Sequence, residues 1–132
     1  MSAEVLAFVL DGNPPSGNRS ARIGGARPYT PAEVRDYRER IGSVAFAEMR
    51  RQKFERPEYA SVAITIYNTR LDADNAVADV LDGMNGIVYE NDGRILDLEI
   101  YKRRDKAGPR VAVRVAASDH IGAGYGSRKK AK

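Results

Sequence analysis

The sequence predicts a single small α+β domain, with two main helices on a mixed or antiparallel sheet in the order β-loop-α-β-α-β-β. The chain has 132 residues, which is close to the usual size of one domain. Segments with the alternation typical of strands are interleaved with two segments of helical periodicity. We see no internal repeat, so we expect one folded domain over residues 1–120 and a disordered, basic, Gly-rich tail over residues 121–132.

The first half of the chain predicts a strand, a loop and a long helix. Residues 4–11 are mostly apolar and predict a buried strand, and the Gly-, Pro-, Asn- and Ser-rich stretch after them predicts a loop. Thr30, Pro31 and Glu33 fit a capping box, from which helical spacing continues to about residue 52. Several polar side chains on the outer face of this helix are expected to be solvated: Arg35, Arg38 and Glu39.

The middle of the chain predicts a second strand that leads into a second helix. In YASVAITIYNTRLD, residues 59–72, Val62, Ile64 and Ile66 share one face, and residues 68, 70 and 72 continue their parity. Asp74 then occupies the cap position of a helix that ends near Gly83–Gly86. The polar face of this helix is expected to carry four residues: Asn75, Ala78, Asp79 and Asp82.

The last third predicts two more extended segments. Asn91-Asp92-Gly93 is typical of a hairpin turn between strands. In the strand after this turn, apolar residues alternate with polar ones, and Lys102 has the parity of the buried set. PRVAVRVAA, residues 109–117, predicts the final strand.

Charge is distributed unevenly along a chain whose formal net charge is +4. Between Asp72 and Glu99 there are 8 acidic residues and one basic residue. Residues 19–56 hold 10 basic and 5 acidic residues, and residues 102–114 hold 6 basic and one acidic. An acidic block between basic blocks suits a metal-dependent enzyme that acts on a polyanion, although an ordinary mixed surface would give the same counts.

The aspartates of the acidic block predict a metal site. Like charges this close in sequence disfavour one another's ionisation, unless they fan out into water or a cation lies among them. Asp72, Asp74 and Asn75 lie where a strand end enters a helix, so their side chains can turn toward one point. Carboxylate oxygens suit Mg²⁺, with Mn²⁺ as the alternative ion, and Asp92 would add a third carboxylate.

The same aspartates also have a purely structural interpretation. Asp74 can act only as a helix cap, Asp72 can be a surface residue at a strand end, and Asp92 can be an ordinary turn residue. Spacing does not decide between a metal site and a structural domain whose aspartates only cap helices and form turns.

Four motifs occur in order along the chain: PPSGNR, RPYTPAEVRDYRERI, DADNAVADVLDGMNG, and Asn91-Asp92 followed by an extended run to Lys102. This order resembles the RusA family of Holliday-junction resolvases over roughly residues 5–115. The resemblance implies a small homodimer that binds four-way or branched DNA and nicks two opposed strands with Mg²⁺, in DNA recombination and repair. It implies that Asp72, Asp74 and Asp92 are catalytic metal ligands, and that Asn75 and Asp82 support them.

One position departs from the family pattern. Family members carry a lysine four residues after the second motif aspartate, and here that position is Ala78. Lys102 is the preferred replacement catalytic cation because its parity directs it inward at a strand end, and Arg70 and Arg19 are alternatives. If none of them acts, the chain is a junction- or branched-DNA-binding protein with weak or no cleavage.

Contacts to DNA phosphates are expected from the basic segments, with an affinity that falls as salt rises. The residues expected to bind DNA are Asn18, Arg19, Arg22, Arg27, Arg70, Arg103 and Arg104. The absence of cysteine excludes a disulfide framework, a zinc–thiolate site and a catalytic thiol, and it suits a cytoplasmic protein. No segment approaches membrane-spanning length, and His120 is expected to be a surface residue.

Overall fold

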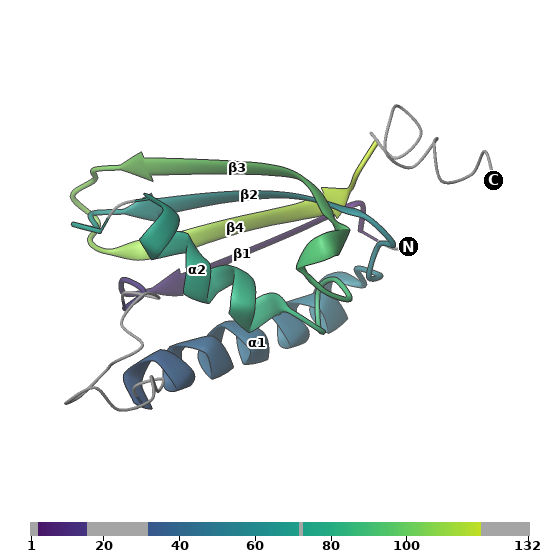
Figure 1. Cartoon of the computed structure of the whole chain (residues 1–132), viewed down its shortest axis with the longest axis horizontal. Coiled ribbons are helices and arrows are strands. Elements are labelled where there is room, and N and C mark those ends of the chain that lie inside the picture. The colour runs from purple at the N-terminus through teal and green to yellow at the C-terminus, as the bar shows by residue number, and fades with distance from the viewer. Residues whose placement is uncertain (1–2, 16–31, 72, 120–132) are drawn as a thin grey trace, which may run out of the picture.

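A computed structural model describes residues 3–15, 32–71 and 73–119, without the side chains of residues 73–75. It contains a four-stranded sheet and two main helices (Figure 1). The elements are β1 (Val5–Asp11), α1 (Ala32–Gln52), β2 (Ala60–Tyr67), α2 (Ala73–Met84), the short 3₁₀ helix η1 (Asp92–Arg94), β3 (Ile95–Arg103) and β4 (Arg110–Ala117). The predicted fold class and element order are confirmed.

The sheet is mixed, with the strand order β1-β4-β2-β3. β4 lies antiparallel to β1 and to β2, whereas β2 and β3 run parallel. A parallel pair needs a crossover, and α2 supplies it between β2 and β3. The carboxyl ends of β2 and β3 therefore lie at the same edge of the sheet, and α2 begins just beyond that edge.

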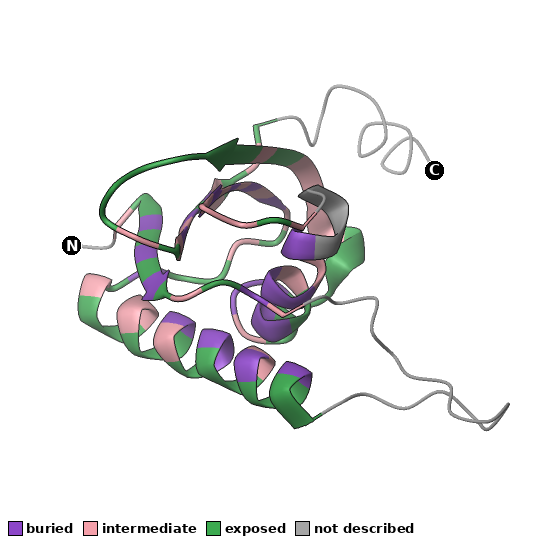
Figure 2. Cartoon of the chain, turned by 90° about the vertical axis from the view of Figure 1, so that its left-hand side faces the viewer, coloured by how far each residue is buried: buried purple, intermediate pink, exposed green. Residues whose placement is uncertain are grey.

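The core lies on one face of the sheet, where α1 and α2 cover alternate strand residues (Figure 2). The predicted buried strand is present as β1, but it alternates between buried and exposed positions and is therefore buried on one face only. Leu6, Phe8 and Leu10 point into the core, whereas Val5 and Val9 are 38% and 54% exposed. Within the part of the chain that the structure describes, no helix covers the opposite face of the sheet.

Two glycines allow α1 and α2 to pack closely. A Cβ atom on Gly83 would lie 2.8 Å from the Arg38 carbonyl oxygen and 2.8 Å from Ile41 Cβ. A Cβ atom on Gly42 would lie 2.9 Å from Ile87 Cδ1 and 3.0 Å from the Gly83 carbonyl oxygen. These approaches are shorter than van der Waals contact, so the helix crossing depends on the missing side chains.

Gly83→Ala is expected to lower the free energy of unfolding by about 1–3 kcal/mol, because the new methyl group meets backbone that cannot easily yield. Gly42→Ala should cost less, since one of its two close neighbours is the end of a flexible Ile87 side chain. Urea unfolding of both variants measures the difference. Equal stability of Gly83→Ala and the wild type would contradict this packing.

Two local predictions near the acidic block are wrong. Asp74 lies within the first turn of α2, which begins at Ala73, and so it is not the cap residue. Asn91-Asp92-Gly93 does not form a hairpin turn, because β3 pairs with β2 in parallel. Instead Asn91 caps η1, with its side-chain oxygen accepting a hydrogen bond from the Gly93 N–H at 2.9 Å.

Several predictions concern residues outside the described ranges. These are the loop from residue 16, the cap formed by Thr30 and Pro31, His120 and the basic tail over residues 121–132. Among the residues that are described, no helix is long and apolar enough to span a membrane.

Candidate active site

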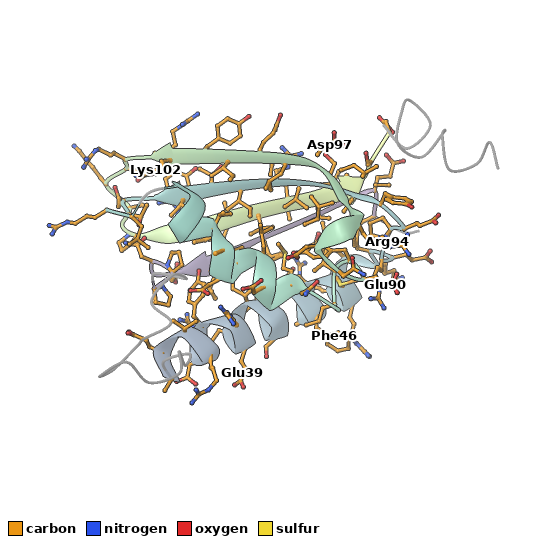
Figure 3. All side chains as sticks on the ribbon, viewed as in Figure 1. Glu39, Phe46, Glu90, Arg94, Asp97 and Lys102 are labelled. Atoms are coloured by element: carbon orange, nitrogen blue, oxygen red, sulfur yellow. The ribbon has the colours of Figure 1, made fainter. Side chains whose placement is uncertain are left out.

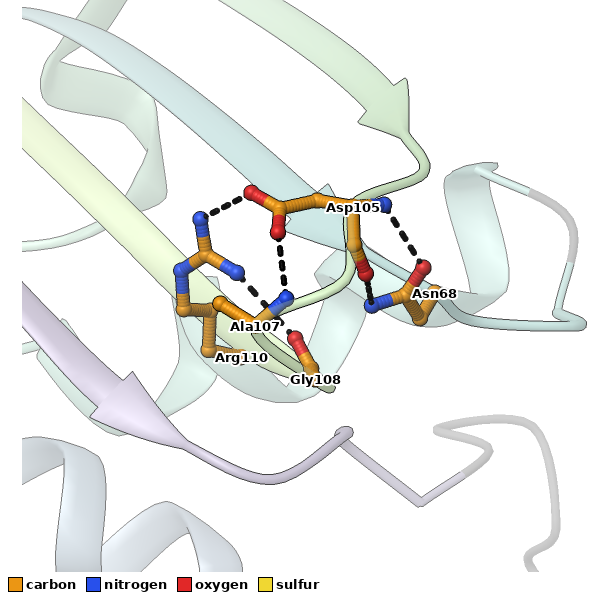
Figure 4. Close-up of polar contacts among 5 residues, drawn as sticks. All are labelled: Asn68, Asp105, Ala107, Gly108 and Arg110. Atoms are coloured by element: carbon orange, nitrogen blue, oxygen red, sulfur yellow. Dashed lines mark hydrogen bonds and ion pairs between the residues drawn. The ribbon is translucent and has the colours of Figure 1, made fainter.

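The edge formed by the carboxyl ends of β2 and β3 is built around Asn68. Its φ of 64° is left-handed, a conformation that Asn tolerates better than most residues, and it ends the alternation of β2. β2 ends at Tyr67, so the parity predicted for residues 68 and 70 does not continue, and residue 72 lies outside the described residues. The Asn68 side chain donates to the Asp105 carbonyl at 2.9 Å and accepts from the Asp105 N–H at 3.1 Å (Figure 4). The end of β2 is thus fixed to the β3–β4 connection.

Asp105 is itself held in place at this edge. Its carboxylate accepts hydrogen bonds from Arg110 at 2.7 Å and from the Ala107 N–H at 2.6 Å (Figure 4). These bonds, the Arg110 bond first, lower the pKa of Asp105 below its ordinary value. The connection between β3 and β4 is therefore an ordered platform beside the segment that leads to Asp72.

Lys102 lies at this edge, close to the predicted catalytic segment. It pairs in register with Ile66 near the end of β3, where Figure 3 shows it. Its ammonium donates a 2.6 Å hydrogen bond to the Leu71 carbonyl, directly before Asp72 in the sequence. Lys102 is exposed, so its charge is available both to this segment and to a bound anion.

The start of α2 carries two of the predicted ligands. Asp74 and Asn75 belong to its first turn, where the helix dipole favours negative charge, and the Asp72 position lies outside the described residues. Positions 74, 78 and 82 are four residues apart and therefore follow one face of the helix. Ala78 is half-buried in the middle of this face, and Asp82 is exposed at its far end.

Arg38 of α1 contacts two aspartates of α2, and the sequence did not predict this contact. Its Nε lies 3.0 Å from Asp79 Oδ1, and its Nη2 lies 3.2 Å from Asp82 Oδ2. Asp79 is fully buried, and its Oδ2 has no hydrogen-bond partner within the described part of the chain. Burial raises the pKa of Asp79, which Arg38 partly offsets. Arg38 and Asp79 were both expected on solvated faces, so this prediction is wrong for the pair.

Asp92 lies near Asp82 rather than near Lys102. Partial desolvation, and then the charge of Asp82, raise the pKa of Asp92. Asp82 and Asp92 also raise the pKa of the buried Tyr89, after the larger effect of burial. Tyr89 donates a 2.6 Å hydrogen bond to the Leu81 carbonyl, which holds the segment after α2 against the helix.

Asp92 and Lys102 lie at opposite ends of β3. The extended backbone from Ile95 to Lys102 alone spans about 23 Å. Within one chain, therefore, Lys102 belongs with the start of α2, and Asp92 belongs with its end. The two groups do not meet at a single point.

The basic residues predicted to bind DNA divide into two sets. Arg70, Arg103 and Arg104 are exposed at the same edge as Lys102. The four from the early loop lie outside the described residues: Asn18, Arg19, Arg22 and Arg27. The edge therefore combines a cluster of cations with the start of α2.

A divalent cation would suit the end of α2 chemically, because burial and then the charge of Asp82 oppose the ionisation of Asp92, and a cation offsets that cost. Within the described residues, no three acidic or histidine side chains are grouped closely enough to hold a metal. The side chains of Asp72, Asp74 and Asn75 are not among those residues, so the predicted ligand set stays a prediction.

A mixed sheet with a basic edge beside an acidic helix start is an arrangement suited to acting on a nucleic-acid backbone. The family model for endodeoxyribonuclease RusA matches residues 11–116, which is most of the chain. No match was found among curated proteins. The chain belongs to the RusA endodeoxyribonuclease family and is thus a junction-resolving endonuclease in general class.

Proposed function

We propose that this chain resolves four-way DNA junctions by paired nicks in a Mg²⁺-dependent reaction, and that it acts as a homodimer in recombination and repair. The family match supplies the reaction class. The observation that carries the proposal is the position of Lys102, whose ammonium contacts the Leu71 carbonyl directly before the Asp-Ala-Asp-Asn motif. A cation and a carboxylate pair at one sheet edge are the parts that phosphodiester hydrolysis needs.

Asp72 and Asp74 would hold the metal, with Asn75 in support. Within one chain Asp82 and Asp92 lie at the other end of α2, so Asp92 would complete this set as the third ligand from the second copy of the homodimer, with Asp82 beside it in support. When bound, Mg²⁺ or Mn²⁺ supplies a water of lowered pKa and neutralises phosphate charge. Lys102 would face the scissile phosphate and stabilise the negative charge that develops on it. Arg70, Arg103 and Arg104 would bind neighbouring phosphates and orient the strand.

A homodimer follows from the symmetry of the substrate, because two opposed cuts need two active sites related by a two-fold axis. β3 is an edge strand of the sheet and exposes 43% of Leu98, although alternation predicted that residue to be buried. An unpaired edge with an exposed apolar side chain favours pairing with another strand. The molar mass from light scattering, for wild type and Leu98→Glu, tests whether this edge joins two copies.

The alternative function is binding of branched DNA without efficient cleavage, and Ala78 is the observation that favours it. No cation projects from position 78, and the nearest described cation on that side of α2, Arg38, is already paired with Asp79 and Asp82. On this alternative, affinity for junctions is kept and the chemical step is slow.

The test of the function is cleavage of a labelled synthetic four-way junction, with linear duplex of the same sequence as the control. We expect symmetric nicks near the branch point with Mg²⁺ or Mn²⁺, and none with EDTA or on the duplex. A bound but intact junction would establish the binding-only alternative. Neither binding nor cleavage of the junction would overturn both functions.

Lys102→Met is expected to lower the single-turnover cleavage rate by roughly 100-fold, because it removes one cation that stabilises the transition state. Junction affinity should change far less, since several other cations share the phosphate contacts. Lys106→Met changes an exposed lysine in the connection that follows β3 and is the matched control. Equal cleavage rates for Lys102→Met and Lys106→Met would show that Lys102 is not a catalytic residue.

A further inference from the structure

The helix-free face of the sheet carries arginines and tyrosines in register. Tyr67 of β2 pairs with Arg103 of β3 on one side and with Arg110 of β4 on the other. Tyr101 lies two residues before Arg103 on the same face. Tyr67 and Arg110 have the parity opposite to the buried residues of their strands, and Tyr101 and Arg103 pair with Thr65 and Tyr67, so all four face away from α1 and α2.

The guanidinium groups lie over the aromatic rings. Arg110 is 3.7 Å from the centroid of Tyr67, and Arg103 is 4.9 Å from the centroid of Tyr101. Arg110 is fixed by Asp105, and the Tyr101 side chain remains 37% exposed. Two flat, positively charged stacks therefore lie side by side on the sheet surface.

This end of the sheet is strongly basic. The described cations there are Arg70, Lys102, Arg103, Arg104, Lys106 and Arg110, and the described acids are Asp11, Glu99 and Asp105, of which Glu99 accepts a 3.2 Å hydrogen bond from the Tyr101 hydroxyl. A surface with this excess of positive charge complements a phosphate backbone. This basic surface adjoins the candidate active site at the edge strand β3. There Lys102 belongs to the active site, and the next residue, Arg103, lies on the other face of the strand.

Stacked Tyr–Arg pairs beside phosphate-binding cations suit unpaired nucleotides. A base in duplex DNA has both faces covered, whereas an unpaired base can stack on an aromatic ring or a guanidinium plane. We propose that Tyr67, Tyr101, Arg103 and Arg110 form a binding surface for single-stranded DNA, which takes unpaired nucleotides next to the branch point. The identity of the substrate rests on the proposed function.

The opposite end of the sheet provides a matched comparison. Arg94 lies 5.1 Å from the centroid of Tyr59, in a third stack of the same chemistry. Two acidic side chains surround that stack, with Glu90 at 2.9 Å and Glu58 at 3.7 Å from the guanidinium. Arg94 is thereby paired with two carboxylates, whereas Arg110 is paired with one and Arg103 with none among the described residues, so the Arg94 stack should attract a phosphate backbone least.

The absence of tryptophan from the chain makes a direct test available. Tyr101→Trp introduces a single fluorescent indole on the proposed surface, and Tyr59→Trp introduces one at the control stack. Titration with oligothymidylate of about 15 nucleotides should quench the Tyr101→Trp emission saturably and less at high salt. The Tyr59→Trp emission should not change.

Affinity measurements complete the test. Tyr101→Ala should weaken oligothymidylate binding roughly 5- to 150-fold, which corresponds to the loss of one base stack, and Tyr59→Ala should not. A Tyr101→Trp protein that cleaves junctions but shows no quenching would overturn the surface alone. The proposed surface would also be overturned if the Tyr101→Trp emission changed with protein concentration but not on addition of DNA, because a second copy of the chain would then cover this face. Quenching in a protein that neither binds nor cuts junctions would uphold the surface and overturn only the proposed function.

Discussion

Asp74→Asn is expected to lower junction cleavage by roughly 100-fold or more, because an amide is a far poorer ligand than a carboxylate for a hard divalent cation. Junction binding should be kept, since the phosphate contacts come from the basic edge. The measurement is single-turnover nicking of a labelled junction beside a binding titration. Asp36→Asn, on the exposed face of α1, is the control for loss of an acidic charge.

The same cleavage assay with Ala78→Lys tests how far the lack of a lysine at position 78 lowers the cleavage rate. Position 78 lies between positions 74 and 82 on one face of α2, so a lysine there would place an ammonium beside the proposed metal ligands. Faster cleavage by Ala78→Lys than by wild type would show that the native site lacks a cation. Unchanged cleavage would show that Lys102 or an arginine already supplies one. Full activity of Asp74→Asn would remove Asp74 from the site.

Arg38→Met is expected to cost about 3–5 kcal/mol of stability at neutral pH, the largest effect on folding that we predict. Asp79 is fully buried, and Arg38 is its ion-pair partner among the described residues. Removing the guanidinium leaves a buried carboxylate without compensation. The double variant Arg38→Met with Asp79→Ala should recover most of the loss, because it removes the stranded charge as well.

The destabilisation in Arg38→Met should depend on pH. Burial already raises the pKa of Asp79 in the folded protein, and loss of Arg38 removes the two contributions that lower it. A raised folded pKa means that the folded state takes up the proton first, so the penalty shrinks as the pH falls through that pKa. Urea unfolding at neutral and mildly acidic pH measures this trend. Arg51→Met, which breaks the exposed pair with Glu48, should show little change at either pH.

Local sequence pattern was sufficient for the framework of the fold. The boundaries of α1 and β4 follow directly from the spacing of apolar residues, because each pattern is long and one face of each element is buried. The prediction was wrong at Asn91-Asp92-Gly93, where the residue types suit a hairpin and a 3₁₀ turn equally well. A hairpin is excluded there because β3 runs parallel to β2, and α2 forms the crossover between these two strands.

The candidate site was predictable only in part. A motif on a strand-to-helix junction, together with the parity of Lys102, predicted Lys102 beside this segment, and its ammonium contacts the Leu71 carbonyl, directly before Asp72 in the sequence. The ion pair between Arg38 and Asp79 was not predictable, because both residues fit the polar stripe of a solvated helix. The burial of Asp79 depends on the close approach of α1 and α2 at Gly42 and Gly83, which is a tertiary effect.

The left-handed backbone conformation at Asn68 limits which amino acids can occupy this position. Glycine would accept the φ of 64° but would lose both hydrogen bonds to Asp105. Aspartate would accept the conformation but has no N–H to donate to the Asp105 carbonyl. Asparagine alone among these meets both demands, so this position should vary little among active relatives.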